Sequence, residues 1–247
     1  MQHFKKNLDD RHGFTLLEMS IVIAIIGLLA GGLMIGQSII RSNQLSTLVN
    51  DAKYYHRAFV QFEDQYNAVP GDMSTATSIW TSAAGNGNGN GLIYAIDSGN
   101  QEVFLAFQHL KMAGLIQGNY TGSAESGGVL HGVPGTNIPG TSLAQVGYYF
   151  FDFNTPEISA GNSTYFQGMY FHPLFIGLYV ANGLPSGAFL TPREAKQLDD
   201  KFDDGLPGMG SLRTLELLTN CVSGTTPTTA TYIVSNTKPQ CRLISTR

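Results

Sequence analysis

The sequence predicts an α+β protein, in which a long N-terminal helix precedes a domain of short strands and additional helices. Two observations support this prediction. An uncharged apolar stretch near the N-terminus continues into a pattern whose apolar residues recur at steps of three and four, as on one face of a helix. Beyond residue 67, aromatic and β-branched runs are bounded by Gly, Pro and Asn, as strands usually are.

The composition limits the classes of function. The chain of 247 residues can hold a membrane segment and one sizeable domain, and its aromatic fraction of 11% supports a packed core. Only 13% of residues are charged, and the formal net charge is −4. A protein whose main partner is nucleic acid usually carries a basic patch or stripe, so the composition argues against nucleic acid as the main partner.

The first helical segment has the length of a membrane span. Residues 19–40 carry no formal charge, and at about 1.5 Å per residue they can cross a bilayer. Lys5, Lys6 and Arg11 precede the span and predict a cytoplasmic N-terminus, so the chain after Arg41 is exported. A cleaved signal peptide would have a shorter apolar region and a small-x-small site after it. A plain signal anchor is the other alternative.

The apolar pattern continues beyond the span as a stripe. Together these segments predict one helix over residues 14–66, ended by Pro70, whose outer half packs on the domain. The stripe consists of Leu45, Leu48, Ala52, Tyr55, Phe59, Phe62 and Tyr66.

Three further helices are expected in the domain, over residues 71–80, over residues 101–116 and from Pro192 onward. In the third, Thr191 can cap the N-terminus, Glu194 completes a capping box and Gly205 can end the helix.

Strands are expected within residues 144–153, 169–181 and 231–235, where aromatic and β-branched residues concentrate. Residues 118–140 read as a long surface loop. The sequence GNGNGNG at residues 85–91 has Asn where a calcium loop would need carboxylates, which predicts a flexible turn-rich loop.

The stretch "RHGFTLLEMSIVIAIIGLLA" carries the most specific signal. A short charged leader, Gly13, Phe14, an apolar run and Glu18 resemble the class III leader of type IV prepilins and type II secretion pseudopilins. In that family a membrane aspartyl peptidase cuts between the Gly and the Phe and then methylates the new N-terminus. The resemblance implies cleavage after Gly13 and N-methylation of Phe14, with the hydrophobic segment retained.

Glu18 has a role implied by the same resemblance. A carboxylate costs a few kcal/mol in hydrocarbon, so it usually has a partner or a task. In the family this Glu is thought to pair with the N-terminal amine of the adjacent subunit. Glu18 and Phe14 are therefore the expected assembly residues, because their pairing neutralises both charges and fixes the axial register.

The resemblance also implies a pilin-like fold, in which the long helix packs on a C-terminal domain with an antiparallel β-sheet. The expected organisation is a cleaved leader (1–13), a transmembrane and assembly helix (14–40), an amphipathic stalk helix (41–67) and an exported globular domain (68–247). The chain would be a single-pass protein of the bacterial inner membrane and then part of a periplasmic or extracellular fibre. Its expected partners are other pilin or pseudopilin subunits, the prepilin peptidase/methyltransferase, the inner-membrane assembly platform and membrane lipid.

Three functions follow from these patterns. The first is a subunit of a type IV pilus-like or type II secretion pseudopilus fibre. The second is a minor pilin whose exported domain is a ligand-binding or adhesive tip module. The third, a membrane-anchored exported enzyme, is disfavoured, because a generic anchor needs neither Gly13 nor Glu18 and the sequence contains no G-x-S-x-G, H-x-x-x-H or C-x-x-C motif. We therefore predict that the protein is not an enzyme.

Two features near the C-terminus complete the candidate sites. Cys221 and Cys241 are expected to form a disulfide in an exported domain, and many pilins close an exposed loop in this way. An acidic group at the end of the capped helix has two interpretations. The preferred one is a solvated face partly neutralised by Lys196, Lys201 and Arg213, and the alternative is a structural Ca²⁺ site, as some pseudopilins have; no other cofactor is expected. This group consists of Asp199, Asp200, Asp203 and Asp204.

Overall fold

The computed structural model describes residues 13–82, 85–94, 101–153, 157–159, 164–214 and 220–247. Residues 1–12 of the expected leader (1–13) lie outside these ranges. The chain divides into two compact units, Met1–Asn43 and Gln44–Arg247, and each is described by itself.

Helix α1 (Leu16–Tyr66) confirms the long N-terminal helix predicted from the apolar pattern. In the first unit its large apolar side chains are exposed, from Leu16 (92%) to Ile40 (61%). The helix ends before Pro70, because Asn67 adopts a left-handed backbone (φ 48°) while its N–H still donates to the Glu63 carbonyl. Asn tolerates this conformation better than most residues, which makes it a suitable helix terminator.

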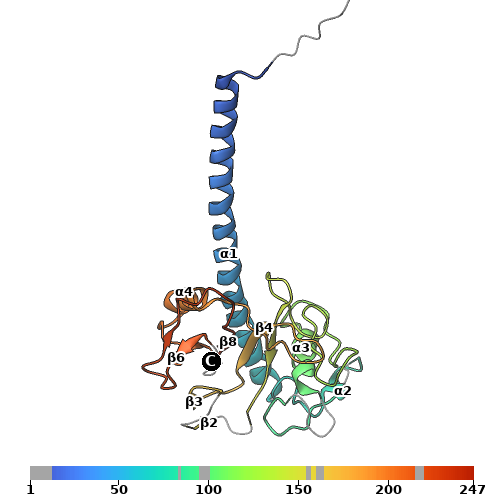
Figure 1. The fold of residues 1–247 in the computed structure, drawn as a ribbon. Helices are drawn as coiled ribbons and strands as arrows, with labels where there is room; N and C mark the ends of the chain where they lie inside the picture. The colour runs from blue at the N-terminus through green and yellow to red at the C-terminus, as the bar shows by residue number, and fades with distance from the viewer. Residues whose placement is uncertain (1–12, 83–84, 95–100, 154–156, 160–163, 215–219) are drawn as a thin grey trace, which may run out of the picture. The chain divides into compact units, whose positions relative to one another are not determined.

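The second unit contains a four-stranded antiparallel sheet, which confirms the predicted class of fold (Figure 1). Its strands, in spatial order, are β1 (Val146–Phe150), β4 (Leu174–Leu178), β8 (Leu243–Ser245) and β5 (Leu212–Thr214). Both β1 and β4 lie within the predicted strand regions. The strands β5 and β8 were not predicted, because three residues are too few to show an alternating pattern.

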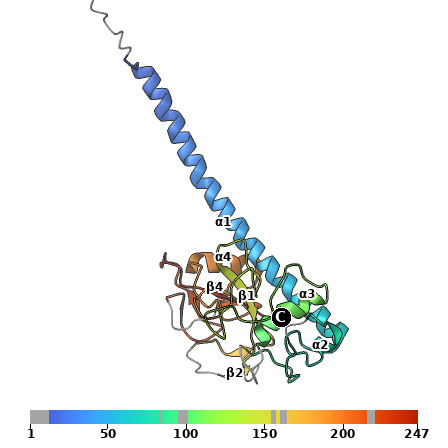
Figure 2. The same cartoon turned by 90° about the vertical axis from the view of Figure 1, so that its right-hand side faces the viewer.

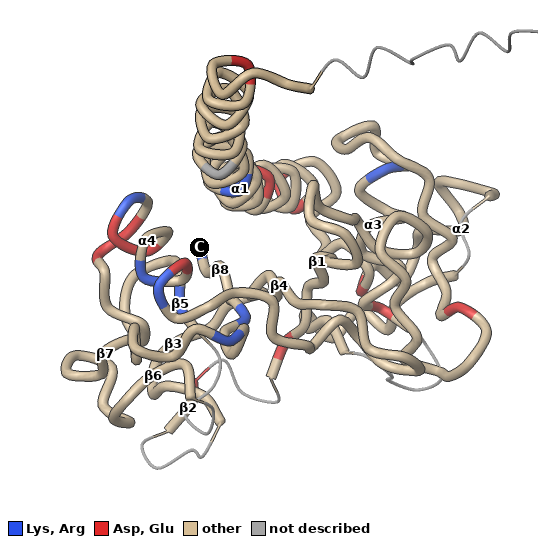
Figure 3. The backbone as a smooth tube through the Cα atoms, turned by 45° about the horizontal axis from the view of Figure 1, so that its top comes forward, with Lys and Arg blue, Asp and Glu red and all other residues tan. Residues whose placement is uncertain are grey.

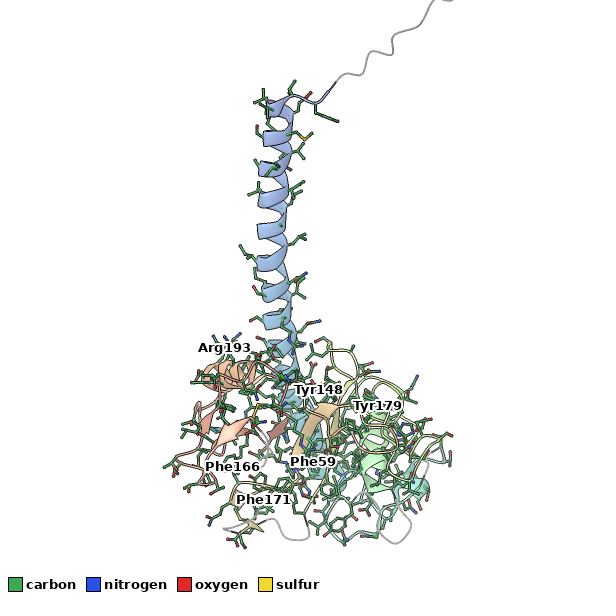
Figure 4. The ribbon with its side chains drawn as sticks, in the orientation of Figure 1. Phe59, Tyr148, Phe166, Phe171, Tyr179 and Arg193 are labelled. Carbon is green, nitrogen blue, oxygen red and sulfur yellow. A yellow bond between two sulfur atoms is a disulfide. The ribbon has the colours of Figure 1, made fainter. Side chains whose placement is uncertain are left out.

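The part of α1 within the second unit packs on this sheet through the predicted stripe. Leu48, Phe59 and Phe62 are fully buried, and the Tyr148 hydroxyl of β1 donates to the Leu48 carbonyl at 3.0 Å. The Phe59 ring lies 4.7 Å from Phe150 on the same strand. Figure 4 labels Phe59 and Tyr148 in this core. Burial of each such side chain contributes about 1.5–3 kcal/mol.

The other helices differ in how well they match the expectation (Figure 2). α3 (Glu102–Met112) and α4 (Pro192–Phe202) form where helices were predicted. The helix predicted over residues 71–80 is wrong in extent, because α2 covers only Ala76–Ile79. The preceding residues are diverted by Gly71, whose φ of 93° is incompatible with a right-handed helix.

Two small hairpins lie outside the main sheet. One joins β2 (Glu157–Ile158) to β3 (Gly168–Met169), and the other joins β6 (Val222–Ser223) to β7 (Thr231–Tyr232). Figure 3 shows β6 and β7 free of charged residues, whereas the neighbouring α4 carries both signs.

Candidate assembly and binding sites

The N-terminal site is organised by a capping box that the sequence reasoning overlooked. The Thr15 backbone N–H and hydroxyl donate to Glu18 Oε2 at 2.8 and 2.9 Å, and the Glu18 N–H donates to Thr15 Oγ1 at 3.2 Å. The T-x-x-E spacing was the available signal. These bonds hold the Glu18 carboxylate at the first turn of α1, close in sequence to Phe14, which is 79% exposed.

The surroundings of this site are open. A side chain at Gly13 would meet no atom within 4 Å, and Glu18 itself is exposed. The carboxylate therefore keeps room for a further hydrogen-bond donor from outside the chain. Among the described residues, α1 is the one helix long and apolar enough to cross a membrane.

The Gly/Asn loop before α3 is held in place, unlike the flexible loop expected from its composition. Asp72 is 3% exposed, and its carboxylate accepts backbone N–H groups from Gly89, Asn90 and Gly91 at 2.7–3.1 Å. A Cβ on Gly87 would collide with the Asp72 backbone. The Asn residues therefore matter less as metal ligands than as residues of a loop that wraps a buried carboxylate.

Two buried groups on α3 extend this arrangement. Glu102 is fully buried and accepts the N–H groups of Asn88 and Tyr94, both at 3.1 Å. His109 accepts the Gly71 N–H at Nδ1 (3.0 Å), and its Nε2 lies 3.3 Å from the Gly85 carbonyl. These partners fix the proton on Nε2, and burial lowers the pKa of His109 to about 4.

A third buried carboxylate, Asp152, joins the segment that follows this loop to the sheet. Asp152 is 2% exposed, follows β1, and accepts the Ile93 N–H at 2.8 Å and the His172 ring at 2.7 Å. His172 also stacks on Phe59 at 5.0 Å. Because the His172 backbone N–H also donates to Asp152 at 2.9 Å, this pair ties the segment after β1 to the segment before β4.

The acidic group at the C-terminal end of α4 separates into members with different environments. Asp200 pairs with Lys196 at 2.6 Å and takes no part in the cluster. Asp199, Asp203 and Asp204 each offer a carboxylate oxygen within 4.8 Å of the others. Asp199 is fully buried, so solvation does not account for it, and burial raises its pKa to about 6.

Each cluster carboxylate already accepts hydrogen bonds from the chain. Asp199 accepts from the Gly205 N–H and the Tyr232 hydroxyl, and Asp203 accepts from the Leu212 N–H. Lone pairs remain on all three, and their spacing fits a hard cation such as Ca²⁺, which takes oxygen ligands at about 2.3–2.6 Å. The residues present therefore fit a Ca²⁺ ion with three carboxylates, not four.

The two cysteines are joined. Cys221 and Cys241 form a disulfide, with their Cα atoms 5.2 Å apart. The bond closes a segment that contains the β6–β7 hairpin, and the Cys241 N–H donates to the Leu190 carbonyl just before α4. The disulfide therefore fastens the hairpin to the start of α4.

Comparison with known proteins gives one match. A model of the prokaryotic N-terminal methylation motif matches residues 8–34, which include Gly13, Phe14 and Glu18. No curated protein and no solved structure matches the chain. Leader and apolar helix together make the chain a single-pass protein of the inner membrane that is exported into a pilus-type fibre. Proteins of this family are typically structural subunits, and the methylation motif with its class III prepilin leader identifies this chain as a type IV pilin-like protein.

Proposed function

We propose that this protein is a structural, non-enzymatic subunit of a type IV pilus-like or type II secretion pseudopilus fibre. Its processing site is the Gly13–Phe14 bond, and its assembly element is the first part of α1. The observation that carries the proposal is the methylation motif at residues 8–34, followed by a helix whose apolar side chains are exposed in the single chain. Such a surface needs lipid before assembly and neighbouring helices after it.

The proposed organisation is a leader at 1–13, a transmembrane and assembly helix at 14–40, a stalk at 41–67 and a globular domain at 68–247. The prepilin peptidase/methyltransferase acts on the first boundary. The inner-membrane assembly platform then receives the mature chain and adds it to other pilin or pseudopilin subunits.

Assembly through Glu18 has a simple electrostatic basis. Cleavage leaves an amine on Phe14, and Glu18 lies in the first turn of the helix, where Thr15 already holds its carboxylate. A neighbour's amine supplies the positive partner that the described residues of a single chain do not. Pairing removes two isolated charges from an apolar helix bundle, where each alone is costly.

Two substitutions test the processing and assembly steps separately. Glu18→Ala should leave cleavage intact, shown by a mature-length band, while the chain disappears from sheared or purified fibres. Gly13→Leu should leave an uncut precursor in the inner membrane. Thr15→Ala is the matched control, because it removes the cap but keeps the charge, and it should still assemble. Normal incorporation of Glu18→Ala would contradict the proposed pairing.

A further inference from the structure

The second unit contains a cavity beside the C-terminal end of α1. Its volume is about 360 Å³, which falls within the range of small-molecule sites, about 300–1,000 Å³. One wall consists of residues 66–69, at the end of α1, and the other of residues 72–75 with Gly89 and Gly91 of the Gly/Asn loop. Figure 2 shows α2, which follows this second wall, close to the same end of α1. We call this cavity the loop pocket.

The walls of the loop pocket are fixed by contacts within the unit. The Asp72 carboxylate accepts the N–H groups of Gly89 and Gly91, each at 2.7 Å, and so holds the loop wall in place. On the opposite wall, the Tyr66 ring packs against Phe62 at 4.6 Å and edge-on against Trp80 at 5.2 Å. Walls that are already held need little ordering on binding, which lowers the entropic cost of taking up a ligand.

Three polar side chains of the lining are available to a ligand. Asn67, Ser74 and Thr75 are exposed, and none of their side chains makes a hydrogen bond within the part of the chain that the structure describes. Thr75 is the N-cap residue of α2, yet its hydroxyl makes no cap hydrogen bond. The lining therefore offers one amide and two hydroxyls, and each of these groups can both donate and accept.

The glycines of the loop leave open space on the other side of the loop pocket. Gly91 has a left-handed backbone with φ of 84°, and a Cβ at this position would meet no atom within 4 Å. Tyr66 and Val69, both partly exposed, supply apolar surface to the lining. A ligand can therefore lie close to the loop backbone while its less polar side contacts the Tyr66 ring.

The charges of the lining favour an uncharged ligand. Among the described residues that line the loop pocket, none is Lys, Arg or His, so an anion would meet no cation. The Asp72 carboxylate is 3% exposed and is already shared by three backbone N–H groups, which leaves a cation little to bind. The ligand that matches this lining is a neutral molecule that carries several hydroxyls and one less polar face.

We propose that the loop pocket binds a saccharide, one neutral sugar ring of a glycan chain. Hydroxyls of the ring pair with the side chains of Asn67, Ser74 and Thr75, since a hydroxyl both donates and accepts. The C–H face of the ring lies on the Tyr66 ring, where it meets the negative face of the aromatic system. The inference does not rest on fibre assembly, because every lining residue belongs to the second unit. It adds recognition of a ligand to the role of a structural subunit.

The test is isothermal titration calorimetry on the full-length chain, solubilised in a detergent that has no sugar headgroup. The probes are neutral trisaccharides of glucose, mannose, galactose and N-acetylglucosamine, with trigalacturonate as the anionic counterpart and the glucosamine trimer as the cationic one. We expect a neutral trisaccharide to bind with a Kd of about 1 mM or below, and its charged counterparts to bind about tenfold more weakly. The fluorescence of Trp80, whose ring lies 5.2 Å from Tyr66, gives a second readout.

Two double variants with the same chemical changes locate the site. Ser74→Ala/Thr75→Val removes both hydroxyls from the lining and should weaken binding about tenfold. Ser78→Ala/Thr81→Val makes the same changes at exposed positions outside the loop pocket and should bind like the unmodified chain. None of the four hydroxyls has a partner in the described part of the chain, so both variants should unfold at the same urea concentration as the unmodified chain.

Three results would overturn the proposal. They are the absence of binding to every neutral trisaccharide, equally tight binding of the charged counterparts, and equal affinities of the two double variants. A chain that binds the sugar but is absent from fibres would contradict the proposed function and leave this inference intact. Failure of the two ideas can therefore be told apart.

Discussion

The buried histidines should make the folded chain sensitive to mild acid. His109 is fully buried, with Nδ1 accepting the Gly71 N–H, so a second proton would place two donors against each other. Burial lowers the pKa of His109 to about 4, and it does the same for His56. In the unfolded chain both titrate near the ordinary value of 6.5. Between these two values the unfolded state binds protons that the folded state does not.

The direction and size of the pH effect on stability follow from this difference in proton binding. Each histidine contributes its full stability above pH 6.5, and the contribution is lost as the pH falls toward 4. At pH 5, each should lower the free energy of unfolding by about 2 kcal/mol relative to pH 8. Asp199 acts in the opposite direction, because its pKa is raised to about 6 and the folded state is then the better proton acceptor. The net loss for the unmodified chain is therefore smaller than the histidine sum.

Urea unfolding of the detergent-solubilised chain at pH 8 and pH 5 measures this effect. The single Trp, Trp80, lies 6.1 Å from the His109 ring and reports on this region by fluorescence. His109→Asn keeps an acceptor for the Gly71 N–H but does not titrate, so it should remove about 2 kcal/mol of the pH dependence. His56→Gln, which keeps a donor for Ser245, should remove a similar and additive amount. If both variants retain the full pH dependence, burial does not hold these rings neutral and the reasoning fails.

Three further predictions concern the second unit. Asp72→Asn removes the charge that three loop N–H groups share and turns an NH₂ toward one of them. The free energy of unfolding should therefore fall by about 3 kcal/mol in the same urea assay. An unchanged urea midpoint would mean that the loop does not depend on Asp72. Cys221→Ser/Cys241→Ser removes the disulfide between residues 20 positions apart and should lower the free energy of unfolding by about 3 kcal/mol. An unchanged free energy of unfolding in oxidising buffer would show that other contacts fasten the hairpin. Addition of Ca²⁺ should raise the melting temperature of the native chain and leave Asp204→Asn unaffected, whereas equal responses of the two proteins would place any bound Ca²⁺ elsewhere.

Local signals in the sequence were sufficient for the helices that carry their own caps. Thr191 and Glu194 form the predicted capping box of α4, because the motif needs only residues three apart. The same T-x-x-E spacing at Thr15 and Glu18 is an equally local signal for the capping box that begins α1. The apolar stripe placed α1 correctly for a similar reason, since one face of one helix is a local pattern.

Long-range contacts explain what could not be predicted. The short strands β5 and β8 exist because β8 pairs with both β4 and β5, and no sequence window contains that information. The loop at residues 85–91 is held by Asp72 and Glu102, which lie on either side of it in the chain. Its composition alone favours a flexible loop. The two carboxylates that order the loop can be identified only once the fold brings them against it.

A common arrangement separates the structural charges of this protein from its proposed assembly charges. A loop-rich domain leaves many backbone N–H groups without a strand partner, and buried ones must still be satisfied. Four acidic side chains meet this need, since each is almost fully buried and accepts at least one backbone N–H. They are Asp72, Glu102, Asp152 and Asp199. Glu18 differs because it is exposed, and an exposed charge contributes little to folding. Its proposed role lies between chains, so Glu18→Ala should impair the fibre while leaving the fold of the single chain intact.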